Sequence, residues 1–161
     1  MRPAVKKTVK CLGVCLFGVY LVILVYLLFF SEGYGRGMDG SVYSYNVHPF
    51  REISRYMKYR GILGTRNVIL NLAGNVVGFM PFGLLLPVFW RNARSFWKVT
   101  LLSFEISALV EFSQLIFHVG CFDVDDMILN TLGGFLGYLL FAGVYRLSTN
   151  YWHPDLRIEE E

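Results

Sequence analysis

Four long apolar stretches dominate the pattern of hydrophobic and polar positions along the chain. They cover roughly residues 11–30, 71–90, 97–117 and 127–145, with polar segments between them. Each is close to the ~20 residues with which an α-helix crosses ~30 Å of hydrocarbon. Backbone polar groups in lipid must be satisfied within their own segment, and the alternation typical of a membrane β-barrel is missing. The pattern therefore predicts an all-α membrane protein with four transmembrane helices in a small bundle.

The lysines and arginines beside these spans predict that both termini are cytoplasmic. Four lie in residues 1–10 and three in the loop between the second and third spans, whereas the loop between the third and fourth spans has none. Such residues gather in cytoplasmic loops. Residues 146–161 then form a polar cytoplasmic tail. Six lysines and arginines in residues 31–66 oppose this orientation, but the alternation of the spans and the basic flank of the first span outweigh them.

The first external loop, residues 31–66, contains an amphipathic segment at residues 50–60. Phe50, Ile53 and Met57 fall on one helical face, and most of the arginines and lysines fall on the other. This pattern predicts a short helix in the outer membrane interface. The first span, preceded by the basic residues, is longer than the ~7–15 apolar residues of a cleavable signal peptide. We expect it to be an uncleaved signal anchor.

Composition narrows the function classes. Of the 161 residues, 55% are hydrophobic and 17% charged, and the net charge is only +3. No basic stripe interleaved with aromatic residues is present, so nucleic-acid binding is not expected. Cys11, Cys15 and Cys121 have no CxxC spacing, and they are predicted to be buried small apolar residues, with S-acylation of Cys11 as the alternative. No metal site and no cofactor are predicted.

Polar residues inside the spans are the most informative, because a carboxylate within a bilayer is costly. In the third span, helical spacing places Ser107, Glu111, Gln114 and His118 on one stripe, with Glu105 off it. The second span carries a matching stripe of Asn67, Asn71, Asn75, Gly78 and Phe82. The Gly74/Gly78 and Gly133/Gly137 pairs predict close helix packing, and Pro81 and Pro87 predict a local break.

The fourth span opens with acidic residues, of which Asp125 and Asp126 are expected to cap the new helix. Together the stripes predict one polar pocket in the outer half of the bundle. Its predicted members are Asn71, Asn75, Glu111, Gln114, Asp123, Asp125, Asp126 and Asn130. The alternative is structural, with amides and glycines joining helices and aspartates serving only as caps.

Three ordered blocks within residues 46–145 resemble the motifs of one family. They are Asn46-Val47-His48-Pro49-Phe50, then Asn71-Leu72-Ala73-Gly74-Asn75 continuing to Pro81-Phe82-Gly83, and finally Glu111-Phe112-Ser113-Gln114 followed by Asp123-Val124-Asp125-Asp126 and Asn130-Thr131-Leu132-Gly133-Gly134. These blocks are similar to those of the VanZ-like family of bacterial membrane proteins. The resemblance implies a multi-pass protein of the bacterial plasma membrane and a contribution to glycopeptide (teicoplanin) resistance.

Four hypotheses for function follow. The leading one is an outward-facing pocket that binds a cell-wall lipid intermediate or a lipophilic glycopeptide, with the lipid bilayer as surroundings. The second is an intramembrane enzyme in which Glu111 is the general base and Asp125 and Asp126 help to hold Mg²⁺ or a water. The third is a proton-coupled transporter, a homo-oligomer that uses Glu105 and Glu111. The fourth is a passive scaffold.

Overall fold

Four long helices build the molecule. The computed structural model describes residues 3–30, 45–117 and 121–152. The long helices are α1 (Pro3–Phe30), α4 (Thr65–Phe89), α5 (Phe96–Phe117) and α6 (Val124–Trp152). The short elements are β1 (Tyr45–Asn46), α2 (Arg51–Lys58), α3 (Arg60–Leu63), η1 (Arg91–Ala93) and β2 (Phe122–Asp123).

Every predicted span coincides with a helix that is long and apolar enough to cross a membrane. These stretches are Cys11–Phe29, Thr65–Phe89, Phe96–Phe117 and Val124–Leu147. The expectation of an all-α protein with four membrane-spanning helices is therefore confirmed. The helices extend beyond the apolar runs, since α4 begins at Thr65 rather than near residue 71, and α6 continues through residues 146–152 of the predicted tail.

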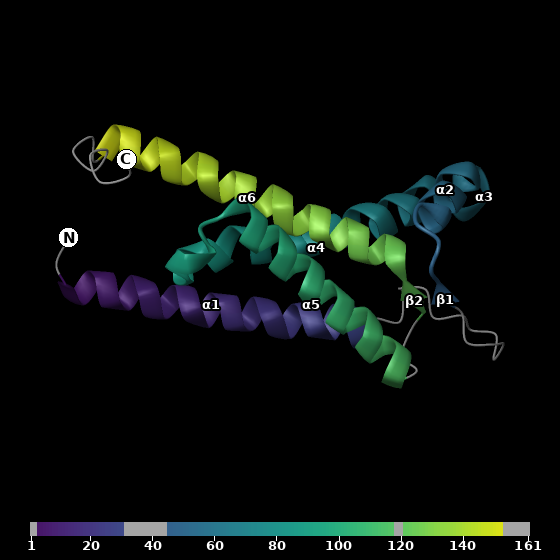
Figure 1. The fold of residues 1–161 in the computed structure, drawn as a ribbon, viewed down its shortest axis with the longest axis horizontal. Helices are drawn as coiled ribbons and strands as arrows, with labels where there is room; N and C mark the ends of the chain where they lie inside the picture. Colours follow the sequence, from purple (N-terminus) through teal and green to yellow (C-terminus); the bar gives the residue numbers. More distant parts are fainter. Residues whose placement is uncertain (1–2, 31–44, 118–120, 153–161) are drawn as a thin grey trace.

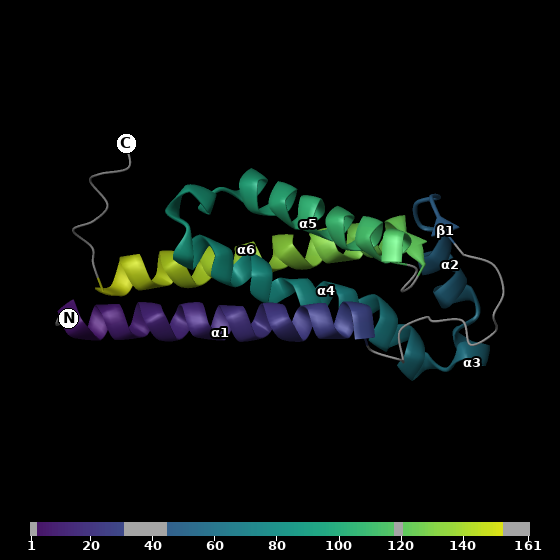
Figure 2. The same cartoon turned by 90° about the horizontal axis from the view of Figure 1, so that it is seen from below.

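The long helices lie side by side, so the molecule has two distinct ends (Figures 1 and 2). The start of α1 and the last turns of α6 lie at one end, which we call the termini end. At the other end, the strand end, α1 finishes, α4 begins, α5 finishes and α6 begins, beside α2, α3 and the two strands.

Glycines allow α4 and α6 to pack closely. A Cβ atom added to Gly133 or Gly137 of α6 would overlap a backbone carbonyl of α4, and one added to Gly83 of α4 would overlap the backbone of α6. The close packing predicted at Gly133 and Gly137 is confirmed, whereas Gly83 was not anticipated. Backbone contact of this kind is how helices associate in lipid, where apolar burial gives no net driving force.

The other contacts place α5 and α1 on this pair. The buried face of α5 carries Val99, Ser103, Ser107 and Glu111, one residue per turn, and a Cβ atom on Gly134 of α6 would overlap the Ser103 side chain. Helix α1 packs on α4 more sparsely. The Tyr20 hydroxyl donates to the carbonyl of Gly78 at 2.8 Å, and Phe17 stacks with Phe82.

Two expectations were wrong. Helix α4 runs unbroken through Pro81 and Pro87 and packs against α6, with Pro87 buried. The three cysteines are exposed rather than buried. Helix α1 meets the bundle along only one stripe, so Cys11 and Cys15 lie away from it. Residues 31–44 of the predicted external loop, and His118, lie outside the described residues.

Candidate functional site

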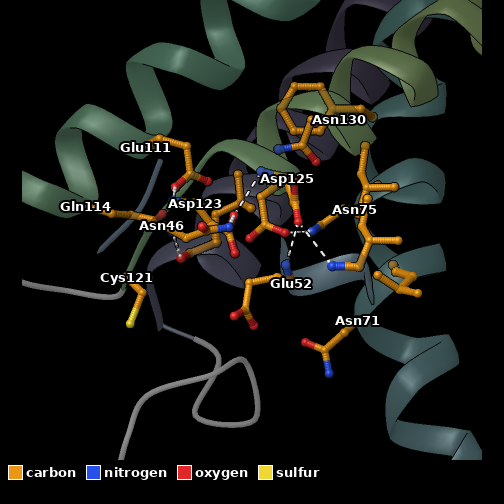
Figure 3. A pocket seen from close by; sticks show the side chains of 18 of the residues that line it. Asn46, Glu52, Asn71, Asn75, Glu111, Gln114, Cys121, Asp123, Asp125 and Asn130 are labelled. Carbon is orange, nitrogen blue, oxygen red and sulfur yellow. Dashed lines mark hydrogen bonds between the residues drawn. The ribbon is translucent and has the colours of Figure 1, made fainter. Parts of the chain in front are cut away.

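A cavity of about 220 Å³ opens at the strand end, between α1, α2, α4, α5 and α6 (Figure 3). We call it the acidic cavity because carboxylates from three helices and from β2 line it. Its acidic lining residues are Glu52, Glu111, Asp123, Asp125 and Asp126. Its amide-bearing lining residues are Asn46, Asn71, Asn75, Gln114 and Asn130. Leu24, Leu27, Leu28, Leu72, Phe79 and Leu129 add apolar surface to the same cavity.

Two short strands set the position of Asp123. Strand β1 pairs with β2 in parallel, with Asn46 in register with Asp123. The Asn46 side-chain amide donates to Asp123 Oδ1 at 2.9 Å, and the same oxygen accepts from the backbone N–H of Asp125 at 2.8 Å. Burial raises the pKa of Asp123, while these two hydrogen bonds oppose that rise. Asp123 thus caps the start of α6 and ties residues 45–46 to the bundle.

Asp125 holds the start of a different helix. Its carboxylate is 1% exposed and accepts backbone N–H groups from Phe50 at 2.5 Å, Glu52 at 2.7 Å and Ile53 at 3.0 Å. These donors lie at the N-cap and in the first turn of α2, where backbone N–H groups lack partners within the helix. Phe50 adopts a left-handed φ of 65° just before that turn. Asp125 is therefore a cap for α2, supplied by α6.

The expectation that Asp125 and Asp126 cap their own helix was accordingly wrong. Because α6 begins at Val124, Asp123 occupies the capping position and the other two aspartates lie in the first turn. Their charge still complements the positive end of the α6 dipole. Asp126 is half-buried and accepts from the Asn75 side chain of α4 at 2.5 Å, so it links α6 to α4.

Glu111 and Asn130 are two further buried polar residues that line the cavity. Glu111 is 2% exposed, and its Oε2 accepts from the backbone N–H of Asp123 at 2.8 Å. Asn130 is 1% exposed, and its Nδ2 donates to the hydroxyl of Ser107 at 2.9 Å. Its Oδ1 is buried and has no hydrogen-bond partner in the described part of the chain. Such an orphaned acceptor is rare in folded proteins.

Gln114 and Asn71 lie nearer the edges of the cavity. The Gln114 amide donates to the carbonyl of Leu28 at 2.8 Å, which joins the end of α1 to α5. The Asn71 amide donates to the carbonyl of Asn67, one turn earlier in α4, at 2.9 Å. Both residues thus have structural contacts as well as a place on the cavity wall.

The structure brings together all eight residues predicted for the pocket, from α4, α5, α6 and β2. Glu105 is not among them, because it is exposed on the outer face of α5. Residues of the first loop were missed as site residues, notably Asn46, Glu52, Arg55 and Tyr56. Asn46 belongs to one of the motifs that resemble the family, whereas Glu52, Arg55 and Tyr56 lie in the segment that was predicted to be an interfacial helix. Burial of Tyr56 against the cavity raises the pKa of its hydroxyl.

Most of the charged residues that line the cavity are acidic. Arg55 is the one basic residue in the lining among the residues that the structure describes, and its guanidinium forms an ion pair with Glu52 one turn away. It also lies 5.4 Å from the centre of the Tyr56 ring. Within residues 3–30, 45–117 and 121–152, no three His, Cys, Asp or Glu side chains are grouped so as to hold a metal ion. The cavity therefore offers an acidic, hydrogen-bonding wall beside an apolar one.

The fold and the cavity define a class of protein: a small multi-pass membrane protein with an acidic cavity at one end of four helices. Comparison with known proteins gives the family. The VanZ/LLP1 family model matches residues 17–146, so the chain belongs to the VanZ/LLP1 family and the resemblance in its motifs is confirmed. The chain is 32% identical over 138 residues to Protein VanZ of Enterococcus faecium, an alignment that covers 83% of this chain and 75% of that protein. No solved structure is significantly similar to this chain.

Proposed function

We propose that this protein acts in the bacterial cell envelope by binding the polar head of an amphiphilic molecule in the acidic cavity. The cavity faces the outer side of the plasma membrane if both termini are cytoplasmic. Candidate ligands are a lipid-linked cell-wall intermediate or a lipophilic glycopeptide. A contribution to teicoplanin resistance is the phenotype that we expect, in line with the motif resemblance.

One observation carries this proposal: acidic and apolar surfaces share a single cavity where four spans end. Carboxylates and amides come from α2, α4, α5, α6 and β2, and the last turns of α1 supply Leu24, Leu27 and Leu28. A polar head bound beside Glu111 and Asp126 would leave its hydrocarbon chain against these leucines. Ligand sites commonly combine mainly apolar walls with a few converging polar groups.

The contacts favour binding over the alternative functions. A metal-assisted enzyme would need the carboxylate of Asp125 as a ligand, but both of its oxygens already accept backbone N–H groups of α2. A proton path through Glu105 and Glu111 would need the two to communicate, but Glu105 is exposed away from the cavity while Glu111 is buried in it. No specific contact supports either alternative.

Antibiotic susceptibility in a Gram-positive host tests the proposal. We expect the wild-type protein to protect cells against teicoplanin, and the Glu111→Gln and Asp126→Asn variants to lose that protection. Both changes remove a charge and keep an oxygen that can accept the observed hydrogen bond. Glu105→Gln is the matched control on the same helix, and it should protect as well as wild type. Vancomycin serves as the comparison without a lipid chain.

Membrane abundance must be equal in all strains, so that the comparison reports on function. Equal protection by every variant would exclude the cavity as the source of the phenotype. If the wild type gives no protection, the teicoplanin phenotype does not apply to this chain, and the proposal of a lipophilic glycopeptide as ligand fails.

A further inference from the structure

The amide and guanidinium donors that line the acidic cavity bind oxygen atoms of the protein itself. On the donor side, the amide nitrogens of Asn46 and Asn75 donate to carboxylates of the cavity, at 2.9 and 2.5 Å. The amide nitrogen of Asn71 donates to a backbone carbonyl at 2.9 Å. The Arg55 guanidinium is paired with Glu52. Each of these four side chains thus has a hydrogen bond or an ion pair with a protein oxygen.

Acceptors remain available in the same space. Glu111 receives its hydrogen bond on Oε2, Asp126 on Oδ1 and Asp123 on Oδ1. Within the described chain, the second oxygen of each of these carboxylates has no hydrogen bond. Asn130 Oδ1 adds a fourth acceptor, which is buried and has no partner.

Asn130 distinguishes this cavity from an ordinary acidic surface. Carboxylates at a surface can be satisfied by water, whereas a buried amide oxygen without a donor is destabilising. Asn130 is 1% exposed and lines the cavity beside the acidic residues. A ligand that brings N–H groups into the cavity would supply the donor that this oxygen lacks.

We propose that the head group bound in the acidic cavity is a primary ammonium, and that a phosphate head is excluded. The inference rests on the proposed function and narrows its ligand class. Among the described residues, five carboxylates and one arginine line the cavity, so a cation is attracted and an anion repelled. A primary ammonium has three N–H donors, which match the unused oxygens of Glu111 and Asp126 together with Asn130 Oδ1.

The size of the cavity suits such a head. Its volume of about 220 Å³ is far above what a single water needs. This space admits an ammonium group and its first methylenes. The rest of a hydrocarbon chain would lie along Leu24, Leu27 and Leu28 of α1.

The reaction rate of the Cys121 thiol can report whether a ligand occupies the acidic cavity. It lines the cavity and is exposed, so a bound ligand should slow its reaction with a neutral, hydrophilic maleimide. The protein carries Cys11→Ser and Cys15→Ser and is reconstituted in lipid nanodiscs. Four probes with the same chain are titrated: dodecylammonium, dodecyltrimethylammonium, dodecyl phosphate and dodecyl maltoside.

We expect dodecylammonium to protect Cys121 at a concentration about tenfold or more below that needed for dodecyl phosphate, a difference that corresponds to one lost charge-assisted contact. The trimethylammonium probe, which has the charge and no N–H donor, should protect less well. Asp126→Asn should weaken protection by dodecylammonium about tenfold, and Glu105→Gln should leave it unchanged.

The ranking of probes on the unaltered cavity tests the inference even where a variant folds poorly. Protection by dodecyl phosphate or dodecyl maltoside at least as strong as that by dodecylammonium, and lost in Asp126→Asn, would overturn the ammonium assignment and leave the proposed function standing. Failure of all four probes to protect Cys121 would overturn both.

Discussion

At the residue scale, the role of Asp125 in the structure differs from the roles that its sequence position suggests. In the sequence it is one of several aspartates at a helix start, suited to a metal, a proton or a cap. In the structure its two carboxylate oxygens accept three backbone N–H groups from residues that are 72 to 75 positions earlier in the chain. Its role is to hold α2 over the cavity, so the loop that carries Glu52, Arg55 and Tyr56 depends on it.

The Asp125→Asn substitution should therefore release α2. An amide places N–H groups against backbone donors, and loss of a hydrogen bond to a charged group costs about 1.5–3 kcal/mol. Local opening of α2 should rise roughly ten- to a hundredfold. The rate of trypsin cleavage within α2, at Arg51, Arg55 and Lys58, measures this opening in nanodiscs.

Asp126→Asn is the control for the loss of charge, because Asp126 bonds to Asn75 of α4 and to no residue of α2. Cleavage within α2 at the same rate in both variants would show that Asp125 does not hold this helix.

The membership of the cavity could be predicted at this scale, but the bonding within it could not. Helical spacing places Glu111 and Gln114 on one stripe, and the alternation of spans brings that stripe to the same end as Asn75 and Asp126. Every residue except proline carries a backbone N–H, so a sequence does not show which of these donors a carboxylate binds. The partners of Asp125 therefore could not be predicted, nor could the position of Tyr56 on the cavity wall.

At the scale of elements, the spans follow from apolar length, whereas their close contacts depend on single glycines. The pair Gly133 and Gly137 is recognisable by its spacing, but Gly83 faces the α6 backbone alone. The two-residue strands β1 and β2 are too short for any alternation, so their pairing could not be predicted. The same holds for the division of residues 50–60 between α2 and α3 at Tyr59.

Gly83→Ala should destabilise the bundle. Its Cβ would overlap the backbone of α6, so α4 and α6 must separate, and overpacking of this kind typically costs ~1–3 kcal/mol. We expect a lower melting temperature in detergent. Gly143→Ala, also in a long helix but with open space around it, should leave the melting temperature unchanged or raise it, since alanine favours helix. Equal melting temperatures for the two variants would contradict close α4–α6 contact at Gly83.

At the scale of the whole molecule, the direction of insertion decides which compartment the acidic cavity serves. The cavity lies at the strand end, and the loop between α4 and α5 lies at the termini end, so the two must be on opposite sides of the membrane. The positive charges predict that the strand end is outside. The six lysines and arginines of residues 31–66 oppose this direction. The direction of insertion therefore has to be measured.

Cysteine labelling in protoplasts decides the direction. In a protein with Cys11→Ser and Cys15→Ser, Cys121 at the exposed edge of the cavity should react with a membrane-impermeant maleimide before the cells are opened. In a protein without native cysteines, Asn92→Cys, at an exposed position of η1, should react only after permeabilisation. The reverse pattern would place the cavity in the cytoplasm, where it could not meet a glycopeptide arriving from outside. In that case a binding role would have to involve a ligand of the inner leaflet.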